Sequence, residues 1–480
     1  MSTPENYSKA PASRVGLFGL FIAWVVAVVV VWDTVQDPMT ALVLVCVIPF
    51  AMAALLYLLS KTPMQMTSFL LPGLLIFFKQ NDALIPLLFG GFPVNDVLGA
   101  VLLVYLLIRV RNEDLIDTYR AANILLLSVA GLLAAFMISW IYAVELEQSR
   151  RETLTFVKDL GFALLIALSI RNIRDLRAFV GWFVFSTTFV ALAMLWESAF
   201  GQPFFPDHIR TETWRGEFRS AGSSLEDVPS VATMVAIGVF IALLLALRSS
   251  SARLIMLAAA AIGVAAILGS ITRSAVLVLA AATLFTLWMI RRERVFPYAA
   301  MAAGIAAVIV YMALPASTIE KFTALSDNST DPTVSRRVDY IRIGADLFQE
   351  SPVLGIGAGN YPWRYGSDEY KFERAVAGER RVLHNVYVQY PVEVGIVGAV
   401  LFYTQLIAIG LIFWRCARST NAALSRYSEA MLLGYFVLCV QLLFLASKSF
   451  LGVWVLTAAA NAMSKLYADE YRKGPALQRR

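Results

Sequence analysis

Long apolar runs separated by short polar connections extend along the whole chain. Runs of about 20 residues are long enough to cross a bilayer as a helix. They lie at residues 15–32, 40–59, 68–90, 95–108, 121–143, 153–170, 177–198, 229–247, 254–271, 274–290, 297–314, 394–414, 429–446 and 450–464. Twelve to fourteen of them are credible spans, because polar residues interrupt 68–90 and the last run is short. The pattern predicts an all-α polytopic membrane protein, and the uninterrupted runs exclude an outer-membrane barrel, whose strands alternate apolar and polar residues.

The composition agrees with this pattern. Of the 480 residues, 59% are hydrophobic and only 15% are charged, and the mean hydropathy is +0.69. A soluble protein of this length needs far more charge to cover its surface, so a water-soluble multidomain enzyme is excluded. The three cysteines lie in or beside apolar runs without metal-ligand spacing, so neither a disulfide nor a zinc site is predicted.

The basic residues predict the orientation. With the N-terminus in the cytoplasm, 22 of the 40 Lys and Arg fall in inner connections and tails, whereas the short outer connections hold four. Cytoplasmic loops carry this excess in membrane proteins. Both termini are therefore expected in the cytoplasm, and the net charge of +6 reflects topology rather than a nucleic-acid partner.

Two longer connections fall on the predicted outer face, at 199–228 and 315–385. Long loops in compact proteins tend to be functional. The predicted organisation is N-terminal helices at 1–198, central helices with the shorter loop at 199–314, the long loop at 315–385, and C-terminal helices with a cytoplasmic tail at 386–480. Apolar residues at helical spacing predict an amphipathic helix over 334–350, which ends before Pro352.

Three glycines follow this helix in the segment Gly355–Asn360. Alternating glycines permit either a tight backbone turn or a phosphate cradle. A phosphate cradle normally follows a strand and opens a helix, and neither feature is evident in this sequence. We favour the turn and keep phosphate binding as the alternative.

Several cations share the predicted outer face although they lie far apart in the sequence. They are Arg219 in the first long connection, Arg273 between two apolar runs, and Arg336 or Arg337 in the second. A charge at the depth of Arg273 is costly unless it is paired or functional. The alternative is an arginine that reaches lipid headgroups.

His384 precedes the next span and is one of only two histidines. It is either an interfacial hydrogen-bonding residue or a base. Arginine forks pair with diphosphate oxygens, and a histidine with a near-neutral pKa can take the proton of an attacking hydroxyl. Nucleotide sugars and ATP are scarce outside the membrane, so a donor used there is expected to be anchored in the lipid as a lipid diphosphate. No metal or other cofactor is predicted.

Four sequence elements together resemble the bacterial O-antigen ligase and O-antigen polymerase superfamily. In chain order they are Arg219 with Gly222 before a span, Thr272-Arg273-Ser274 between adjacent spans, Arg337 (or Arg336) with a helix and the glycine segment that ends at Asn360, and His384-Asn385 with Glu393, Gly395 and Gly398. The resemblance covers roughly residues 210–400. The N-terminal two hundred residues match only as a series of spans.

This resemblance implies a metal-independent, inverting glycosyltransferase of the bacterial inner membrane with a periplasmic active site. Its donor is a glycan on undecaprenyl diphosphate, and its acceptor is lipid A-core or a second lipid-linked glycan. Carried over to this sequence, Arg219, Arg273 and Arg337 hold the diphosphate and acceptor, and His384 activates or positions the acceptor hydroxyl. Arg336, Asn385 and Glu393 are expected to contact substrate.

Other functions remain open. Ligase and polymerase share the donor and differ in the acceptor; the late outer loop and the His-Asn element favour the ligase. Transfer to Ser, Thr or Asn of a protein differs again only in the acceptor. A flippase or transporter is the alternative from another class, because four charged residues interrupt the spans: Lys79, Asp82, Lys158 and Asp159. Glu226 or Asp227 could replace His384 as the base, although pairing with a nearby arginine is the simpler role.

Overall fold

The computed structural model describes residues 121–202, 204, 211–212, 218–220, 222, 228–248, 252–270, 272–313, 332–370, 380–445 and 450–477. These residues belong to one compact unit. The spans predicted before residue 121, with Lys79 and Asp82, lie outside the described residues. So do the predicted alternative bases Glu226 and Asp227.

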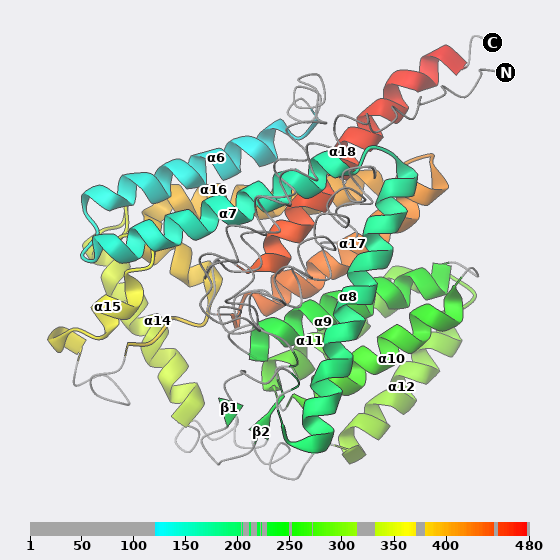
Figure 1. Cartoon of the computed structure of the whole chain (residues 1–480), viewed down its shortest axis with the longest axis horizontal. Helices are drawn as coiled ribbons and strands as arrows, with labels where there is room; N and C mark the ends of the chain where they lie inside the picture. Colours follow the sequence, from blue (N-terminus) through cyan, green and yellow to red (C-terminus); the bar gives the residue numbers. More distant parts are fainter. Residues whose placement is uncertain are drawn as a thin grey trace, which may run out of the picture. The chain divides into compact units, whose positions relative to one another are not determined.

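The described chain is built from helices (Figure 1). They are α6 (Asn123–Ile138) with the short η1 (Ser139–Ile141), α7 (Leu146–Ser169), α8 (Ile173–Phe200), α9 (Val228–Arg248), α10 (Arg253–Gly269), α11 (Arg273–Ile290), α12 (Phe296–Ala313), α14 (Pro332–Glu350), α15 (Tyr361–Tyr365), η3 (Asp368–Tyr370), α16 (Val386–Cys416), α17 (Ala422–Gln441) and α18 (Leu451–Leu477). Two-residue strands, β1 (Thr211–Glu212) and β2 (Phe218–Arg219), pair antiparallel between α8 and α9. Every span predicted after residue 120 has a helix at its place.

Six helical segments of the described part are long and apolar enough to cross a membrane. They are Asn123–Ile141, Ile173–Phe200, Val228–Arg248, Arg273–Ile290, Val386–Cys416 and Ala422–Gln441. Four of these helices, α6, α8, α11 and α16, expose large apolar side chains, as expected of helices that lipid surrounds, whereas nearly all side chains of α9 are buried. The all-α polytopic membrane fold is confirmed for the described residues. The predicted total of twelve to fourteen spans includes runs that lie outside them.

The helices pack in two groups joined by α17. On one side, α16 packs against α6 and α18, and α18 also packs against α7. On the other, α9 packs against α8, α10 and α11, and nearly all its side chains are buried. Figure 1 shows α17 between the groups, in contact with α9 and α11 as well as α16 and α18.

The predicted inner connections meet at one end. Arg248, at the end of α9, forms ion pairs with Glu293 at 2.7 Å and with Glu429 of α17 at 3.0 Å. Glu470 of α18 accepts hydrogen bonds from the backbone N–H of Asn421 at 3.0 Å and from the hydroxyl of Ser419. These contacts hold the ends of α9, α11, α17 and α18 together, and they follow the predicted alternation of connections.

Four helix boundaries differ from the prediction by seven residues or more. The apolar runs place starts at 153, 394 and 429, whereas α7 begins at Leu146, α16 at Val386 and α17 at Ala422. The prediction also ends the last span at 464, but α18 continues to Leu477, through residues expected to form a tail. Apolar windows detect only the part of a helix that lipid or the core surrounds. Polar turns at the ends are helical because tertiary contacts satisfy their backbone groups.

The predicted amphipathic helix over 334–350 is confirmed as α14. Its inward face belongs to a small core within the long loop, which packs onto the start of α16. The buried members of this core are Tyr340, Ile343, Leu347, Ile356, Tyr361, Tyr365, Tyr370, Leu383 and Val392. The hydroxyl of Tyr361 donates to the carbonyl of Tyr340 at 2.8 Å. The described part of the long loop therefore packs as a compact layer over the start of α16.

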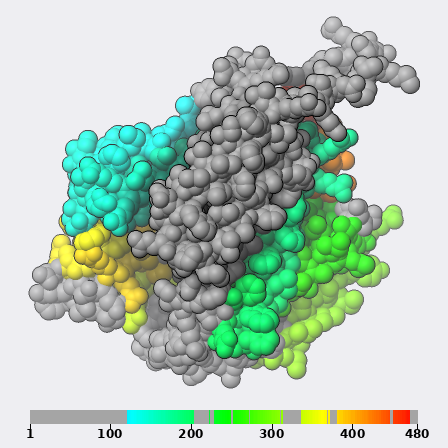
Figure 2. Space-filling view, in the orientation of Figure 1, coloured from blue at the N-terminus to red at the C-terminus, as the bar shows by residue number. Residues whose placement is uncertain are grey.

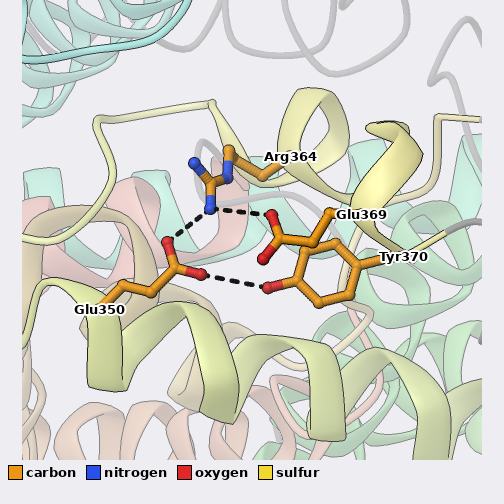
Figure 3. A network of polar contacts seen from close by, with 4 residues as sticks. All are labelled: Glu350, Arg364, Glu369 and Tyr370. Carbon is orange, nitrogen blue, oxygen red and sulfur yellow. Dashed lines mark hydrogen bonds and ion pairs between the residues drawn. The ribbon is translucent and has the colours of Figure 1, made fainter.

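A polar network closes the rim of this layer (Figure 3). The Arg364 guanidinium contacts the carboxylates of Glu350 at 2.5 Å and Glu369 at 3.5 Å, and the Tyr370 hydroxyl donates to Glu350 at 3.3 Å. Burial first, and then the nearby carboxylates, raise the pKa of Tyr370 to about 12. Tyr370 thus stays protonated and donates to Glu350 at any physiological pH.

Candidate functional site

The predicted outer connections gather at the other end of the bundle, and the Arg219 segment belongs to them. The hydroxyl of Ser198, near the end of α8, contacts the Ser220 hydroxyl at 3.0 Å and the Gly269 carbonyl at 3.4 Å. The backbone N–H of Gly222 donates to the Glu197 carboxylate at 2.7 Å. The backbone of Arg219 lies in β2, directly before this docked segment. The segment therefore lies beside the turn that leads into α11.

Arg273 begins α11 at this same end, and its side chain is half-buried. The next residue, Ser274, accepts a hydrogen bond from the buried amide of Gln441 at 3.3 Å, at the end of α17. The following carbonyl, Leu442, accepts from the backbone N–H of Val386 at 3.0 Å, the first residue of α16. The start of α11, the end of α17 and the start of α16 thus lie side by side.

Arg337 of α14 reaches this cluster from the long loop. Its guanidinium lies 5.7 Å from the centroid of the Phe444 ring, and Phe444 follows α17 closely. Such cation–π contacts are attractive and leave the charge on the arginine. Adjacent helical residues point about 100° apart, so Arg336 faces a different direction. Of the two predicted registers, Arg337 is the one that the fold brings to Phe444 and His384.

His384 lies beside Arg337, between the small core and the start of α16. Its ring is 5.9 Å from that of Tyr340, centroid to centroid. Its φ of 57° is a left-handed conformation that is uncommon for a residue with a Cβ. Such strained residues cluster at functional sites, where surrounding contacts hold them.

The electrostatic environment of His384 differs from the expectation. Burial, followed by the positive charges of Arg337 and Arg381, lowers the pKa of His384 to about 4. The predicted near-neutral pKa is therefore wrong, because the sequence does not reveal burial or the two neighbouring guanidinium groups. The imidazole is neutral at physiological pH and has a lone pair available for a proton.

Two residues expected to contact substrate have local structural roles. The Asn385 side chain accepts a hydrogen bond from the Val388 backbone N–H at 3.3 Å and thereby caps α16. Glu393 is fully buried, and its carboxylate accepts hydrogen bonds from the Gly359 N–H at 2.6 Å and the Gln389 amide at 3.0 Å. This burial argues against a direct contact between Glu393 and substrate.

The glycine segment is a buried turn. All six backbone N–H groups from Gly355 to Asn360 donate to acceptors of the protein. In order, these acceptors are the carbonyls of Ser351, Val392 and Glu393, the Ser139 hydroxyl, the Glu393 carboxylate and the Gly357 carbonyl. A phosphate cradle needs N–H groups that point at the ligand. The predicted turn is confirmed, and the phosphate-cradle alternative is wrong.

The connection between α6 and α7 holds this turn from the other side. The Asn360 side chain accepts from the Glu145 backbone N–H at 2.7 Å and donates to the Ser149 hydroxyl at 2.8 Å, while Ser149 donates to the Ala358 carbonyl at 2.7 Å. Figure 2 shows the yellow residues of the long loop against the cyan residues of α6 and α7. Sequence analysis missed this contact, because about two hundred residues separate the two segments.

We expect Gly395→Ala to destabilise the folded protein strongly. Gly395 breaks α16 with a φ of 66°, and a Cβ there would lie 2.0 Å from the Val353 carbonyl oxygen. The left-handed conformation alone costs an alanine about 1–2 kcal/mol, and the clash adds to this. The measurement is thermal unfolding in detergent or nanodiscs.

Gly181→Ala is the matched control for this substitution. Gly181 lies within α8, and a Cβ there meets no described atom within 4 Å. Alanine is the better helix former, so the control is expected to unfold at the wild-type temperature or slightly above. Equal unfolding temperatures for the two variants would contradict the assigned role of Gly395.

Some expectations concern residues at the margins of this site. Lys158 is exposed and Asp159 is buried, so these neighbours point to different faces of α7 as predicted. Arg381 is a charged neighbour of His384 that sequence analysis did not single out, although it lies only three residues away.

Within the described residues, no cluster of three or more His, Cys, Asp or Glu has the arrangement of a metal site.

A family model described as O-antigen ligase matches residues 258–403. Residues 258–403 are thus similar to an O-antigen ligase domain. The predicted resemblance to the O-antigen ligase and polymerase superfamily is thereby confirmed, and the match includes Arg273, Arg337 and His384 but not Arg219. No curated protein matches the chain. The domain supports a glycosyltransferase-like membrane enzyme that acts in surface glycan biosynthesis.

Proposed function

We propose that this protein transfers a glycan from undecaprenyl diphosphate to a sugar hydroxyl of lipid A-core at the periplasmic face of the bacterial inner membrane. The observation that carries the proposal is the neighbourhood of Arg337 and His384, next to the helix ends that bear Arg273. The proposal also rests on the O-antigen ligase domain that contains all three residues. The basic inner connections support the orientation.

The reaction needs charge neutralisation at one bond and proton removal at another. The bond between the sugar anomeric carbon and the diphosphate oxygen breaks, and the lipid diphosphate leaves with the electron pair. Arg273 and Arg337 stabilise the negative charge that develops on the leaving group, and we assign Arg219 the same role. The acceptor hydroxyl forms the new bond from the opposite face, so the anomeric configuration inverts. No step of this scheme requires a metal.

His384 takes the proton of the attacking hydroxyl in this scheme. The neutral imidazole has the lone pair that general-base catalysis requires. Bound diphosphate places negative charge beside Arg337 and Arg381 and offsets their repulsion of an imidazolium. Binding of the donor therefore raises the pKa of His384 at the stage at which the imidazole must accept the proton. When the lipid diphosphate departs, the pKa falls again and His384 loses the proton to solvent.

Reconstitution with defined acceptors tests the proposal. The purified chain in liposomes receives an undecaprenyl-diphosphate glycan and either lipid A-core or a second lipid-linked glycan, and mass spectrometry identifies the product. A glycosylated lipid A-core is the expected product. A product only on the second lipid-linked glycan would replace ligase by polymerase. Glycan movement across the membrane without any transfer would contradict the enzyme and favour a flippase.

The matched control for reconstitution is the double variant R337A/H384A. We expect it to lose transfer with both acceptors while the folded protein remains monodisperse. The transport alternative makes the opposite prediction: function is lost with Lys158→Ala and kept when Arg273 and His384 are replaced.

A further inference from the structure

Helix α16 is two helices joined by a kink. Val394 and Gly395 have non-helical backbone angles, with φ of −124° and 66°, and Pro391 lies just before them. The short first part, residues 386–393, is called the arm below, and His384 and Asn385 directly precede it. Because Pro391 has no N–H, the Tyr387 carbonyl is available one turn earlier, and it accepts the Tyr403 hydroxyl at 2.7 Å. The direction of the arm therefore depends on contacts outside the regular helical ladder.

Pro352 and the glycine turn that follows it together supply contacts on both sides of the kink. Before the kink, the Val392 carbonyl accepts from the Ile356 N–H at 3.0 Å, and the Glu393 carbonyl accepts from the Gly357 N–H at 2.9 Å. After it, the Ile396 N–H donates to the Pro352 carbonyl at 2.9 Å. The segment from Pro352 through the glycine turn thus bridges the arm and the main part of α16.

The Glu393 side chain completes this bridge. Its carboxylate joins the Gly359 N–H, in the turn, to the Gln389 amide, in the arm. All these groups are buried, and a carboxylate only accepts hydrogen bonds, so it matches two converging donors. The turn is itself held to the α6–α7 connection through Asn360 and Ser149. The arm is consequently fixed to a part of the protein that lies outside the O-antigen ligase match.

We propose that Glu393 is a positioning residue, which locks the glycine turn to the arm of α16 and thereby holds His384 at the site. This inference rests on the proposed function for its catalytic consequence. The structural part of the inference is the position of His384 relative to Arg337 and Arg381. This position can be tested without an assay of glycan transfer.

Two substitutions at Glu393 separate positioning from charge chemistry. Within the described part of the chain, the Gln389 Oε1 atom has no hydrogen-bond partner. In E393Q the new amide can donate to this oxygen once the Gln389 side chain flips, and the remaining oxygen still accepts from Gly359. E393L has a similar volume but cannot accept either hydrogen bond. A positioning role therefore tolerates E393Q and not E393L.

For transfer, we expect E393L to lower kcat by about a hundredfold, the effect of a misplacement of roughly 1 Å, with the KM for the donor nearly unchanged. E393Q is expected to stay within a few fold of wild type. If E393Q loses as much activity as E393L, the negative charge itself takes part and the proposal is overturned.

A spectroscopic measurement gives the structural answer independently of activity. The chain has two histidines, so His208→Gln leaves His384 as the single histidine. NMR of ¹³C-labelled histidine across pH then reports the protonation of His384 alone. We expect a pKa of about 4 in the parent protein and in E393Q. E393L is expected to move the pKa upward, toward the ordinary value of about 6.5, as the arm leaves the buried, positively charged surroundings.

A purely structural role would lower the unfolding temperature of E393L but leave the pKa of its folded form unchanged, and that result would overturn the proposal. If E393L does not fold, Ser149→Ala replaces it as a milder variant that weakens the anchor of the turn. The pKa of His384 is then expected to rise by a smaller amount. The His384 pKa could respond to the Glu393 substitutions as expected in a protein that shows no transfer activity. That result would refute the proposed function and leave this inference standing.

Discussion

Arg337→Ala is expected to lower kcat for glycan transfer by about a hundred- to a thousandfold, the effect of removing one preorganised donor to a developing negative charge. The Arg337 guanidinium lies beside Phe444 and acts on His384, at the end of the bundle where the start of α11 meets the end of α17. Its fork can pair with two diphosphate oxygens at once. The measurement is steady-state transfer from a lipid-diphosphate glycan in liposomes.

Arg337→Lys should cause an intermediate loss, because an ammonium keeps the positive charge without the planar fork. Arg342→Ala is the matched control, since Arg342 belongs to the same helix and its side chain is exposed. We expect the control to transfer at the wild-type rate. A loss of less than threefold in R337A, with normal folding, would remove Arg337 from the proposed mechanism.

His384→Ala is expected to reduce kcat by about a hundred- to ten-thousandfold, the usual contribution of general-base catalysis. His384→Gln keeps a polar side chain of similar reach but cannot take the proton, so it should be equally impaired. Activity retained in both variants would leave His384 as a positioning residue and direct attention to another base.

The pH dependence distinguishes the base from an ordinary surface histidine. The pKa of free His384 is about 4, so the imidazole is protonated only below that value, and kcat/KM should fall only as the pH approaches 4. Bound diphosphate stabilises the imidazolium, so the acidic limb of kcat should lie at a higher pH than that of kcat/KM. R337A should move the limb of kcat/KM upward, because one repelling charge is gone. A wild-type limb of kcat/KM near 6.5 would contradict this environment.

The topology was largely readable from the sequence. Apolar runs of about 20 residues have few alternatives to a membrane helix, because a helix satisfies its own backbone groups in lipid. Alternation of connections across the bundle then requires Arg219, Arg273 and Arg337 to share one end. The structure agrees for the described residues, through contacts such as Ser198 to Gly269 and Gln441 to Ser274.

The chemistry of individual site residues was less readable. Glycines at 355, 357 and 359 are compatible with a phosphate cradle as well as with a turn, and the decision depends on where their N–H groups point. The family resemblance implied that Glu393 contacts substrate. Burial of a carboxylate is costly, yet two donors from separate segments make the burial of Glu393 possible. Neither partner can be identified from the spacing of residues alone.

The sequence by itself indicated that the protein crosses the membrane as helices and that it resembles O-antigen ligases. It also predicted that Arg219, Arg273 and Arg337 share one end of the bundle. These properties depend on local hydrophobicity, on charge and on short motifs. Only the tertiary structure decided that the glycine turn is closed to ligands, that burial and then Arg337 and Arg381 lower the pKa of His384, and that the α6–α7 connection anchors the site. These features depend on contacts between segments far apart in the chain, and burial and electrostatic effects exist only once such contacts form.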